Sequence, residues 1–333
     1  MQEPLLAGLL LLCSSLQVNA ATPTLTFTSV HMAEGWTLRA TEKGRVVLRT
    51  GDGGRTWHDR TPTAIRAFTF DQGQEYQKNG DDDFQMACLN ASIAWVFEKP
   101  SGNTILVERT RDGGRHWQAS RFTDTVGCSL VVSFADAQHG SLLTISDMAS
   151  GSTRKGLYRT ADGGRTWVFV TEALPDHIDP TGAVFRNHLE GWLTAGYHGS
   201  DEMPLYRTND GGHHWRLQEL TIPALYQDGY GKTYPPSFFG PKRRQGVLPT
   251  AFRVHDPERE GIALYQTQDA GRNWHLLRRL RPIGSLSLKV SLHFINFQTG
   301  WASDDLGPTP KLWRTQDGGR HWRVTCPLRR KSR

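Results

Sequence analysis

The sequence has few cysteines, and their number excludes a scaffold held together by disulfides. Four cysteines occur in 333 residues, and Cys13 lies in a leader segment that we expect to be removed. The other three, Cys88, Cys128 and Cys326, permit at most one intramolecular disulfide and leave one thiol over. Their pairing stays open, and Cys88 is most simply read as a small buried apolar residue.

Patterns of metal ligands are also missing. The sequence contains neither CxxC nor HExxH, and histidines such as His213 and His214 follow a repeat rather than the spacing of ligands. Zinc sites in proteins draw on such patterns. We therefore expect no metal and no other cofactor.

Long apolar segments are absent apart from a short run near the start of the chain. Leu5 to Leu12 are apolar but too few to span a bilayer, and Val18-Asn19-Ala20 supplies the small residues of a cleavage site before Ala21. We predict a signal peptide at residues 1–20 and export to the periplasm or the cell exterior. The usual basic residues are missing from its start. A lipid anchor at Cys13 is the alternative, which the bulky residue before it disfavours.

The charge is modest, with a net value of +6. Basic residues are spread along the chain, with clusters at 242–244 and in an expected C-terminal tail, 327–333. A nucleic-acid partner conflicts with export, so the charge is better matched to an acidic protein surface, a glycan acid or anionic lipid headgroups. We expect a protein or glycan partner, no transmembrane segment after cleavage, and a monomer.

One eight-residue pattern, T-x-D-G-G-x-x-W, occurs six times. We call these segments DGG turns, and they are TGDGGRTW (50–57), TRDGGRHW (110–117), TADGGRTW (160–167), TNDGGHHW (208–215), TQDAGRNW (267–274) and TQDGGRHW (315–322). The closing Trp recurs every 48 to 60 residues, which is the length of one blade of a β-propeller.

The rest of each unit supports this interpretation. Three segments align with one another: HMAEGW at 31–36, RNHLEGW at 186–192 and NFQTGW at 296–301. Each unit therefore has strands before and after a Gly-Trp turn as well as around the DGG turn. The sequence therefore predicts an all-β, six-bladed β-propeller of four-stranded antiparallel blades in a single domain, 24–326. A cryptic seventh blade is the alternative.

Within each DGG turn we expect the Asp carboxylate to accept hydrogen bonds from nearby backbone N–H groups, the glycines to supply conformations that other residues reach only with strain, and the Trp ring to pack over the turn. Six copies of a catalytic residue would make no chemical sense. The residues assigned this structural role are Asp52, Trp57, Asp112, Trp117, Asp162, Trp167, Asp210, Trp215, Asp269, Trp274, Asp317 and Trp322.

The repeated turn resembles the Asp-box, also called the BNR repeat. With its Gly-Trp strands, the chain is similar to the propellers of sialidases, of sortilin-like ectodomains, and of photosystem II assembly factors with their bacterial relatives. The resemblance covers residues 24–326 and implies a β-propeller. These groups share the turn and differ in their loops, so the resemblance implies no single function.

We expect a ligand site on the rim opposite the DGG turns, where two long connections, 58–84 and 216–238, would face each other across the central channel of a six-bladed ring. The alternative is that Asp81 to Asp83 form a solvated loop tip and that the tyrosines pack their own loop. Candidates for catalysis are Asp71, Glu75, Tyr76 and Tyr230, and candidates for ligand binding are Arg66, Asp81, Asp82, Asp83, Tyr226, Asp228 and Tyr234.

Two classes of function fit these features. Resemblance to sialidases implies three arginines for a substrate carboxylate, a Tyr and Glu pair, and an Asp acid, a known variant of glycoside hydrolysis. The Arg-Ile-Pro signature of that group is absent, because LTFTSVHMAEGW stands at 25–36. Resemblance to the assembly factors implies an exported binding or scaffold protein. We favour the binding protein and keep a sialidase-like exo-glycosidase as the alternative.

Overall fold

The computed structural model of the chain describes residues 25–29, 34–41, 44–52, 56–68, 84–99, 102–127, 129–146, 153–176, 178–196, 203–227, 229–254, 260–280, 290–304 and 311–327. The expected signal peptide, Cys13 and Cys128 lie outside these residues. Strand β25 ends at Pro327, so the remainder of the expected basic tail also lies outside them. The described residues include no helix that is long and apolar enough to cross a bilayer.

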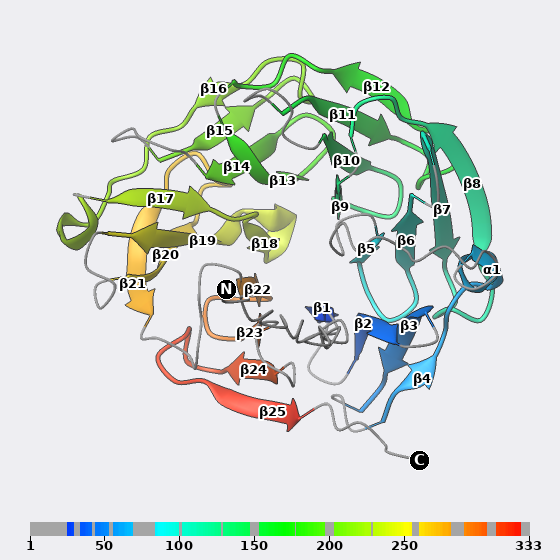
Figure 1. Ribbon diagram of the computed structural model, residues 1–333. Helices are drawn as coiled ribbons and strands as arrows, with labels where there is room; N and C mark the ends of the chain where they lie inside the picture. Colours follow the sequence, from blue (N-terminus) through cyan, green and yellow to red (C-terminus); the bar gives the residue numbers. More distant parts are fainter. Residues whose placement is uncertain are drawn as a thin grey trace, which may run out of the picture.

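The described strands form small antiparallel sheets around a central axis, and the fold is a β-propeller (Figure 1). The all-β propeller predicted from the repeats is therefore confirmed. Four sheets have four strands each. They are β1 (Leu25–Ser29), β2 (Gly35–Thr41), β3 (Gly44–Thr50) and β4 (His58–Asp59); β5 (Phe84–Cys88), β6 (Ala94–Glu98), β7 (Thr104–Thr110) and β8 (Gln118–Thr123); β9 (Ser129–Phe134), β10 (Gly140–Ile145), β11 (Lys155–Thr160) and β12 (Val168–Thr171); and β22 (Val290–Phe294), β23 (Gly300–Asp304), β24 (Lys311–Thr315) and β25 (Arg323–Pro327).

A fifth sheet has nine strands. One part contains β13 (Asp179–Phe185), β14 (Gly191–Gly196), β15 (Leu205–Thr208) and β16 (Arg216–Leu217), and the other contains β18 (Ser237–Phe239), β19 (Gln245–Arg253), β20 (Gly261–Thr267) and β21 (His275–Leu280). Strand β17 (Tyr230–Thr233) joins them, because it pairs with both β14 and β19. Short helices are α1 (Thr63–Phe68), η2 (Ala224–Tyr226) and η3 (Pro241–Arg243).

Each DGG turn is closed by its own side chains. In the turn between β11 and β12, the Asp162 carboxylate accepts hydrogen bonds from the backbone N–H groups of Arg165, at 2.9 Å, and Thr166, at 3.0 Å. The Thr166 hydroxyl donates to the second carboxylate oxygen at 2.7 Å. These bonds satisfy backbone donors that the tight reversal leaves without a strand partner.

The threonine that opens each turn completes this network, a role that the sequence analysis did not assign. The Thr160 hydroxyl donates to Asp162 at 2.8 Å and accepts the N–H of Gly164 at 2.9 Å. The equivalent pair of bonds recurs in the four other turns whose glycines are described. All six threonines are buried; they are Thr50, Thr110, Thr160, Thr208, Thr267 and Thr315.

Neighbouring sheets meet where a large side chain of one sheet contacts the DGG turn of the next. Trp95, on β6, donates its indole N–H to the carbonyl oxygen of Gly163 at 2.8 Å. Its ring stacks on Phe134 of β9, with 3.6 Å between ring centroids. The turn is therefore both a hairpin connection and a contact surface for the preceding sheet.

The second glycine of the turn is required by this contact. Gly164 and Gly271 have φ angles of 85° and 74°, which residues with a side chain rarely adopt. A Cβ atom on Gly271 would lie 2.4 Å from the Trp192 ring, and one on Gly114 would lie 3.2 Å from Trp36. A side chain at Gly271 would therefore push against the Trp192 ring, whereas at Gly164 the φ angle is the restriction, because a Cβ there would lie 3.4 Å from Trp95.

The first glycine is restricted too, since Gly163 has a φ angle of 76° and a Cβ on it would lie 2.7 Å from the Ala137 carbonyl oxygen, yet the fifth copy has an alanine there. Ala270 donates its N–H to the carbonyl oxygen of Arg244 at 2.8 Å, just as Gly163 donates to Gln138. Its φ angle is 66°, so it adopts the left-handed conformation at a cost of about 1–2 kcal/mol. The turn retains its hydrogen bonds but is strained.

Aromatic residues that precede the Gly-Trp turns fill the seams, as their spacing indicates. Phe134, Phe185 and Phe294 are at most 6% exposed, and half-buried Cys88 packs against the cluster around Trp36. The closing tryptophans lie in these seams too, since the Trp167 ring contacts Phe97 and Phe122 of the preceding sheet.

We predict that Asp162→Ala lowers the free energy of unfolding by about 0.5–2 kcal/mol, by analogy with side chains that cap unpaired N–H groups. Partial burial favours a higher pKa for Asp162, but the hydrogen bonds from Thr166, Thr160 and Arg165 lower this pKa from 3.8 to about 2. A carboxyl group with a lowered pKa stabilises the fold above its ordinary pKa. That contribution is lost as the pH falls from about 3.8 to about 2.

Urea unfolding at pH 7 and at pH 2.5 measures both effects, and Glu219→Gln, at an exposed carboxylate, is the control. The difference between wild type and Asp162→Ala should shrink at the lower pH. An unchanged stability at pH 7 would show that the carboxylate does not close the turn.

We predict that Ala270→Gly raises the free energy of unfolding by about 0.5–1 kcal/mol. The glycine removes the strain at φ 66°, and the greater flexibility of the unfolded chain offsets part of this stabilisation. Gly271→Ala in the same turn should lower it, because its Cβ would overlap the Trp192 ring. Thermal and urea unfolding compare the two variants, and destabilisation by Ala270→Gly would contradict the strain argument.

Candidate functional site

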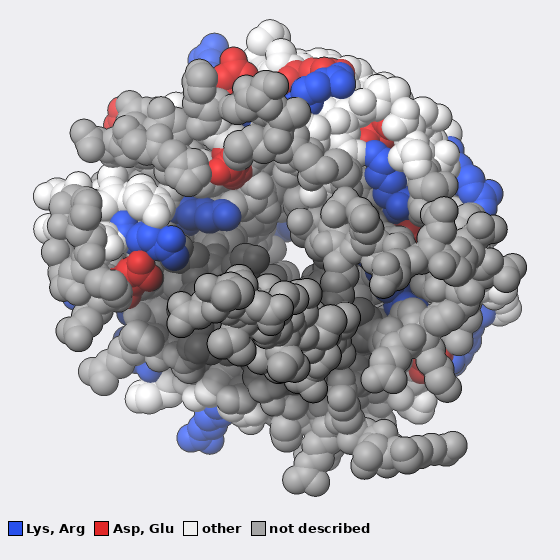
Figure 2. All heavy atoms as spheres, in the orientation of Figure 1, with Lys and Arg blue, Asp and Glu red and all other residues white. Residues whose placement is uncertain are grey.

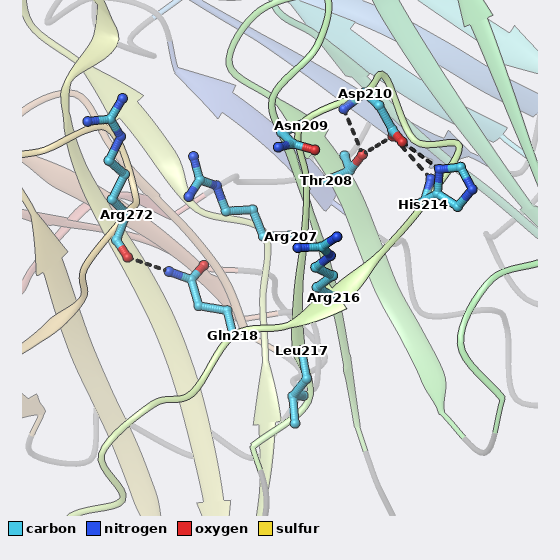
Figure 3. A pocket seen from close by; sticks show the side chains of 9 residues that line it. All are labelled: Arg207, Thr208, Asn209, Asp210, His214, Arg216, Leu217, Gln218 and Arg272. Carbon is cyan, nitrogen blue, oxygen red and sulfur yellow. Dashed lines mark hydrogen bonds and ion pairs between the residues drawn. The ribbon is translucent and has the colours of Figure 1, made fainter.

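A cleft of about 390 Å³ opens beside the DGG turn between β15 and β16 and reaches the turn between β20 and β21. It therefore lies on the edge of the ring that carries the DGG turns, which we call the DGG rim. Its lining residues are Arg207, Thr208, Asn209, Asp210, His214, Arg216, Leu217, Gln218 and Arg272 (Figure 3). Three of these nine residues are arginines, so the cleft is basic.

Arg207, on β15, is held in place by two neighbours. Its guanidinium lies 5.7 Å from the centroid of the buried Trp192 ring, a cation–π distance. Its Nη2 atom donates to a Glu190 carboxylate oxygen at 2.9 Å. The Arg207 charge is therefore largely compensated, and its position is fixed by the sheet.

Arg216 and Arg272 differ from Arg207 in having no counter-charge. Arg216 begins β16, Arg272 follows the second glycine of the next DGG turn, and both are exposed. No carboxylate of the described residues forms an ion pair with either side chain. In Figure 3 they lie on either side of Arg207. Two guanidinium groups, each with five N–H donors, are thus free to bind an anion.

Asp210 is the one carboxylate among the lining residues, and its turn occupies it. It accepts the His214 N–H at 3.1 Å, contacts His214 Nδ1 at 2.7 Å, and accepts the Thr208 hydroxyl at 2.8 Å. Burial favours a higher pKa for Asp210, but the bonds from His214 and Thr208 together hold it below its ordinary value. Asp210 is therefore ionised at neutral pH and is no proton donor there.

Gln218 sets the spacing of the cleft by joining its two sides. Its Oε1 atom accepts the Trp192 indole N–H at 3.0 Å, and its Nε2 atom donates to the carbonyl oxygens of Gly271, at 2.9 Å, and Arg272, at 2.8 Å. Since Gln218 follows Arg216 by two residues, this bridge holds Arg216 and Arg272 in one groove.

Arginines from adjacent sheets also approach one another at two other seams of the DGG rim. Burial lowers the pKa of Arg109, and the charges of Arg165 and Arg111 lower it further. Burial likewise lowers the pKa of Arg278, together with the charge of Arg320. The positive character of the rim is therefore a recurring feature of its seams.

On the opposite rim, two exposed arginines among the described residues are paired with glutamates. Arg154 pairs with Glu172 at 3.1 Å and Arg253 with Glu260 at 3.0 Å. On the face drawn in Figure 2, described basic and acidic side chains lie interspersed around the ring, with an opening near its centre. The described residues thus form no extended patch of one sign there.

The tyrosines expected to bind ligand on that rim are mostly packed. Tyr226 is 3% exposed and stacks on Phe252 with 4.4 Å between centroids. Tyr234 is half-buried, and burial raises its pKa to about 12. Tyr230 is exposed, and Arg253 donates to its hydroxyl at 3.5 Å. This arrangement favours the alternative, stated above, that the tyrosines pack their own loop.

The remaining candidates are only partly described. Arg66 lies on α1, on the opposite side of the ring from β17 (Figure 1), and its side chain is outside the described part. Asp71, Glu75, Tyr76, Asp81, Asp82, Asp83 and Asp228 lie outside the described residues. Among the described residues, no group of three His, Cys, Asp or Glu side chains is placed to hold a metal.

Sequence reasoning did not single out Arg216, Gln218 or Arg272. One signal was present, since the position after the second glycine is Arg in five of the six DGG turns. A residue that recurs in this way indicates a structural property of the repeat and does not mark one turn as a binding site. Gln218 has no counterpart in the repeat pattern, and its role depends on a turn more than 50 residues away.

We predict that Gln218→Ala lowers the free energy of unfolding by about 1–3 kcal/mol, because the buried Trp192 indole N–H loses its acceptor. Glu219→Ala, at the exposed neighbouring residue, should change it by no more than about 0.5 kcal/mol. Urea unfolding of the two variants tests this, and equal stabilities would show that the bridge contributes nothing.

Comparison with solved structures finds other proteins of this architecture. An ulvan lyase, from a new family of polysaccharide lyase termed PL25, superposes with a TM-score of 0.51 at 9% identity over 93% of this chain and 84% of that chain. YCF48 bound to D1 peptide gives 0.46 at 17% identity over 91% and 82%. The GH74 xyloglucanase from Xanthomonas campestris gives 0.47 at 17% identity, and the match covers 93% of this chain and 47% of that one.

No protein-family model matches this chain, and no curated protein does so. At identities below 20% the structural similarity concerns the fold alone. The comparisons therefore agree with the strand topology in one conclusion, that this chain is a β-propeller protein.

Proposed function

We propose that this chain is an exported binding or scaffold protein, and that it holds an acidic group of a protein or glycan partner in the cleft between β16 and the β20–β21 turn. The observation that carries the proposal is the pair of exposed guanidinium groups, Arg216 and Arg272, for which the described residues supply no counter-charge. This moves the expected ligand face from the opposite rim to the DGG rim.

Arginine suits this role because its planar fork matches a carboxylate or sulfate with two parallel hydrogen bonds. Arg207 gives the cleft a fixed wall, and Gln218 limits how far its two sides can separate. A net charge of +6 would also attract acidic partners before contact. A cleft of this kind selects by charge and shape and needs no catalytic group.

The ring that carries the cleft has, we infer, six blades. The nine-stranded sheet contains two four-stranded groups, β13–β16 and β18–β21, and each has its own DGG turn. Strand β17 joins them as an additional strand. With the four separate sheets this makes one blade for each of the six repeats, and the cleft lies at the seam that β17 reinforces.

The alternative is a sialidase-like exo-glycosidase. Three arginines in one cleft resemble the carboxylate-binding set of that group, and some structural neighbours are named as glycan-active enzymes. The described residues that line the cleft include no Tyr and no Glu, however, and Asp210 is engaged in its turn. The geometry of the cleft therefore favours binding over hydrolysis.

Binding of two acidic probes, a fluorescent hexaglutamate peptide and polygalacturonate, tests the proposal, with hexaserine and dextran as neutral counterparts. We predict that Arg216→Gln combined with Arg272→Gln weakens binding of an acidic probe by about tenfold or more, since each charge-assisted hydrogen bond contributes about 1.5–3 kcal/mol. Binding should also weaken as salt is added.

Arg253→Gln is the matched control, because this arginine is also exposed but pairs with Glu260 on the opposite rim. Its effect should stay within about twofold, a fraction of a kcal/mol. Equal binding by the double variant and wild type would refute the proposal. Turnover of a fluorogenic sialoside by wild type would instead select the glycosidase.

A further inference from the structure

The turn between β18 and β19 contains an unusual concentration of backbone strain. Lys242 and Arg243 have φ angles of 55° and 50°, the left-handed region that non-glycine residues seldom occupy. Ala270, the one other described non-glycine residue with positive φ, donates its N–H to Arg244 of this turn. Strain of this kind persists only where the surroundings enforce it, and it collects at functional sites.

The Arg243 side chain links the strained turn to a distant part of the chain. Its Nη1 atom donates to the carbonyl oxygen of Ala135, which follows β9. Strands β13–β16 lie between these two parts of the ring (Figure 1). Arg186, which follows β13, donates from Nη1 to the carbonyl oxygen of Lys242 at 3.0 Å. The segments that follow β9, follow β13 and join β18 to β19 are thus connected by arginine side chains.

The charge gathered there is incompletely compensated. Arg186 pairs with Glu190, and the same carboxylate also accepts Arg207 of the cleft. Arg243 is half-buried, and none of the described carboxylates lies within ion-pair distance of it. Asp136 is the nearby acidic group. Burial and the Arg186 charge lower the pKa of Arg243, and the Asp136 charge acts in the opposite direction without an ion pair between them. The Asp136 Oδ1 atom accepts the backbone N–H groups of Gln138 and His139. A partly desolvated guanidinium without a paired anion is unfavourable unless a ligand supplies one.

The other titratable groups around Arg243 add little charge. Burial lowers the pKa of His293 to about 4, and the Arg243 charge contributes to the same shift, so His293 is neutral at pH 7. Its Nδ1 atom lies 3.4 Å from the Ser237 hydroxyl. The arginines therefore determine the electrostatics of this position.

We propose that Arg186 and Arg243 form an oxyanion site near the inner strands on the DGG rim, which takes one carboxylate or sulfate group. The two guanidinium groups retain N–H donors that their described partners do not use, and these match the oxygens of such a group. Neither arginine lines the cleft, which distinguishes this site from it. It is separate from the proposed function, although Glu190 contacts arginines of both.

Equilibrium dialysis with radiolabelled sulfate tests the site directly. The measurements use the Arg216→Gln and Arg272→Gln background, so that sulfate in the cleft does not contribute. We expect about one sulfate per chain, and a loss of affinity of about tenfold or more when Arg243→Gln is added. Arg244→Gln, which removes an exposed charge from the same turn, should change the affinity less than about twofold. Competition by acetate and by sodium chloride at equal ionic strength then separates carboxylate, sulfate and general salt effects.

Two outcomes would overturn the proposal. The first is sulfate binding that Arg243→Gln leaves intact. The second combines two results: no sulfate binds in the starting background, and Arg243→Gln lowers the melting temperature equally in sulfate and in chloride. Arg243 would then only stabilise the packing of the sheets. If Arg243→Gln fails to fold, Arg186→Gln replaces it with the same expected loss. Because the cleft arginines are already absent, neither outcome bears on the proposed function.

Discussion

The structure depends on the contact between each DGG turn and the large side chain of the sheet before it. At the best-defined example, the Trp95 indole N–H bonds to the turn carbonyl of Gly163 and its ring lies on Phe134. The contact requires a rigid turn, in which the second glycine, Gly164, has a φ angle of 85° that other residues rarely adopt. Thr160 and Asp162 supply the rigidity with hydrogen bonds inside eight residues. A short local motif thereby determines how whole sheets pack.

The polar groups of each turn fall into two sets, those hydrogen-bonded inside the turn and those exposed to solvent. The Asp carboxylates and Thr hydroxyls are occupied inside the turn, so they are unavailable for ligands or proton transfer. The residue after the second glycine is exposed, as at Arg165, Arg272 and Arg320. The acidic groups of the repeat are therefore hydrogen-bonded inside the turns, whereas these basic groups are exposed to solvent. This difference gives the DGG rim its positive character.

The nine-stranded sheet departs from the regular repeat near the cleft. Strand β17 joins its β13–β16 and β18–β21 parts, and Gln218 spans from Trp192 to the next turn. In the same sheet, the β18–β19 turn adopts a strained conformation, and its Arg243 donates to the carbonyl oxygen of Ala135. Regular repeats thus provide the frame, and irregular segments between them provide the positions where a partner would be recognised.

The sequence by itself determined the all-β propeller and the place of each DGG turn, because the interactions responsible recur within each repeat and follow its spacing. It did not locate the cleft or the pair of Arg186 and Arg243. Whether an arginine is paired depends on residues from other parts of the chain. Arg207 pairs with Glu190, 17 residues before it, and Arg243 donates to the carbonyl oxygen of Ala135, 108 residues before it. No local pattern encodes such contacts, so only the tertiary structure decided which of many similar arginines have no counter-charge among the described residues.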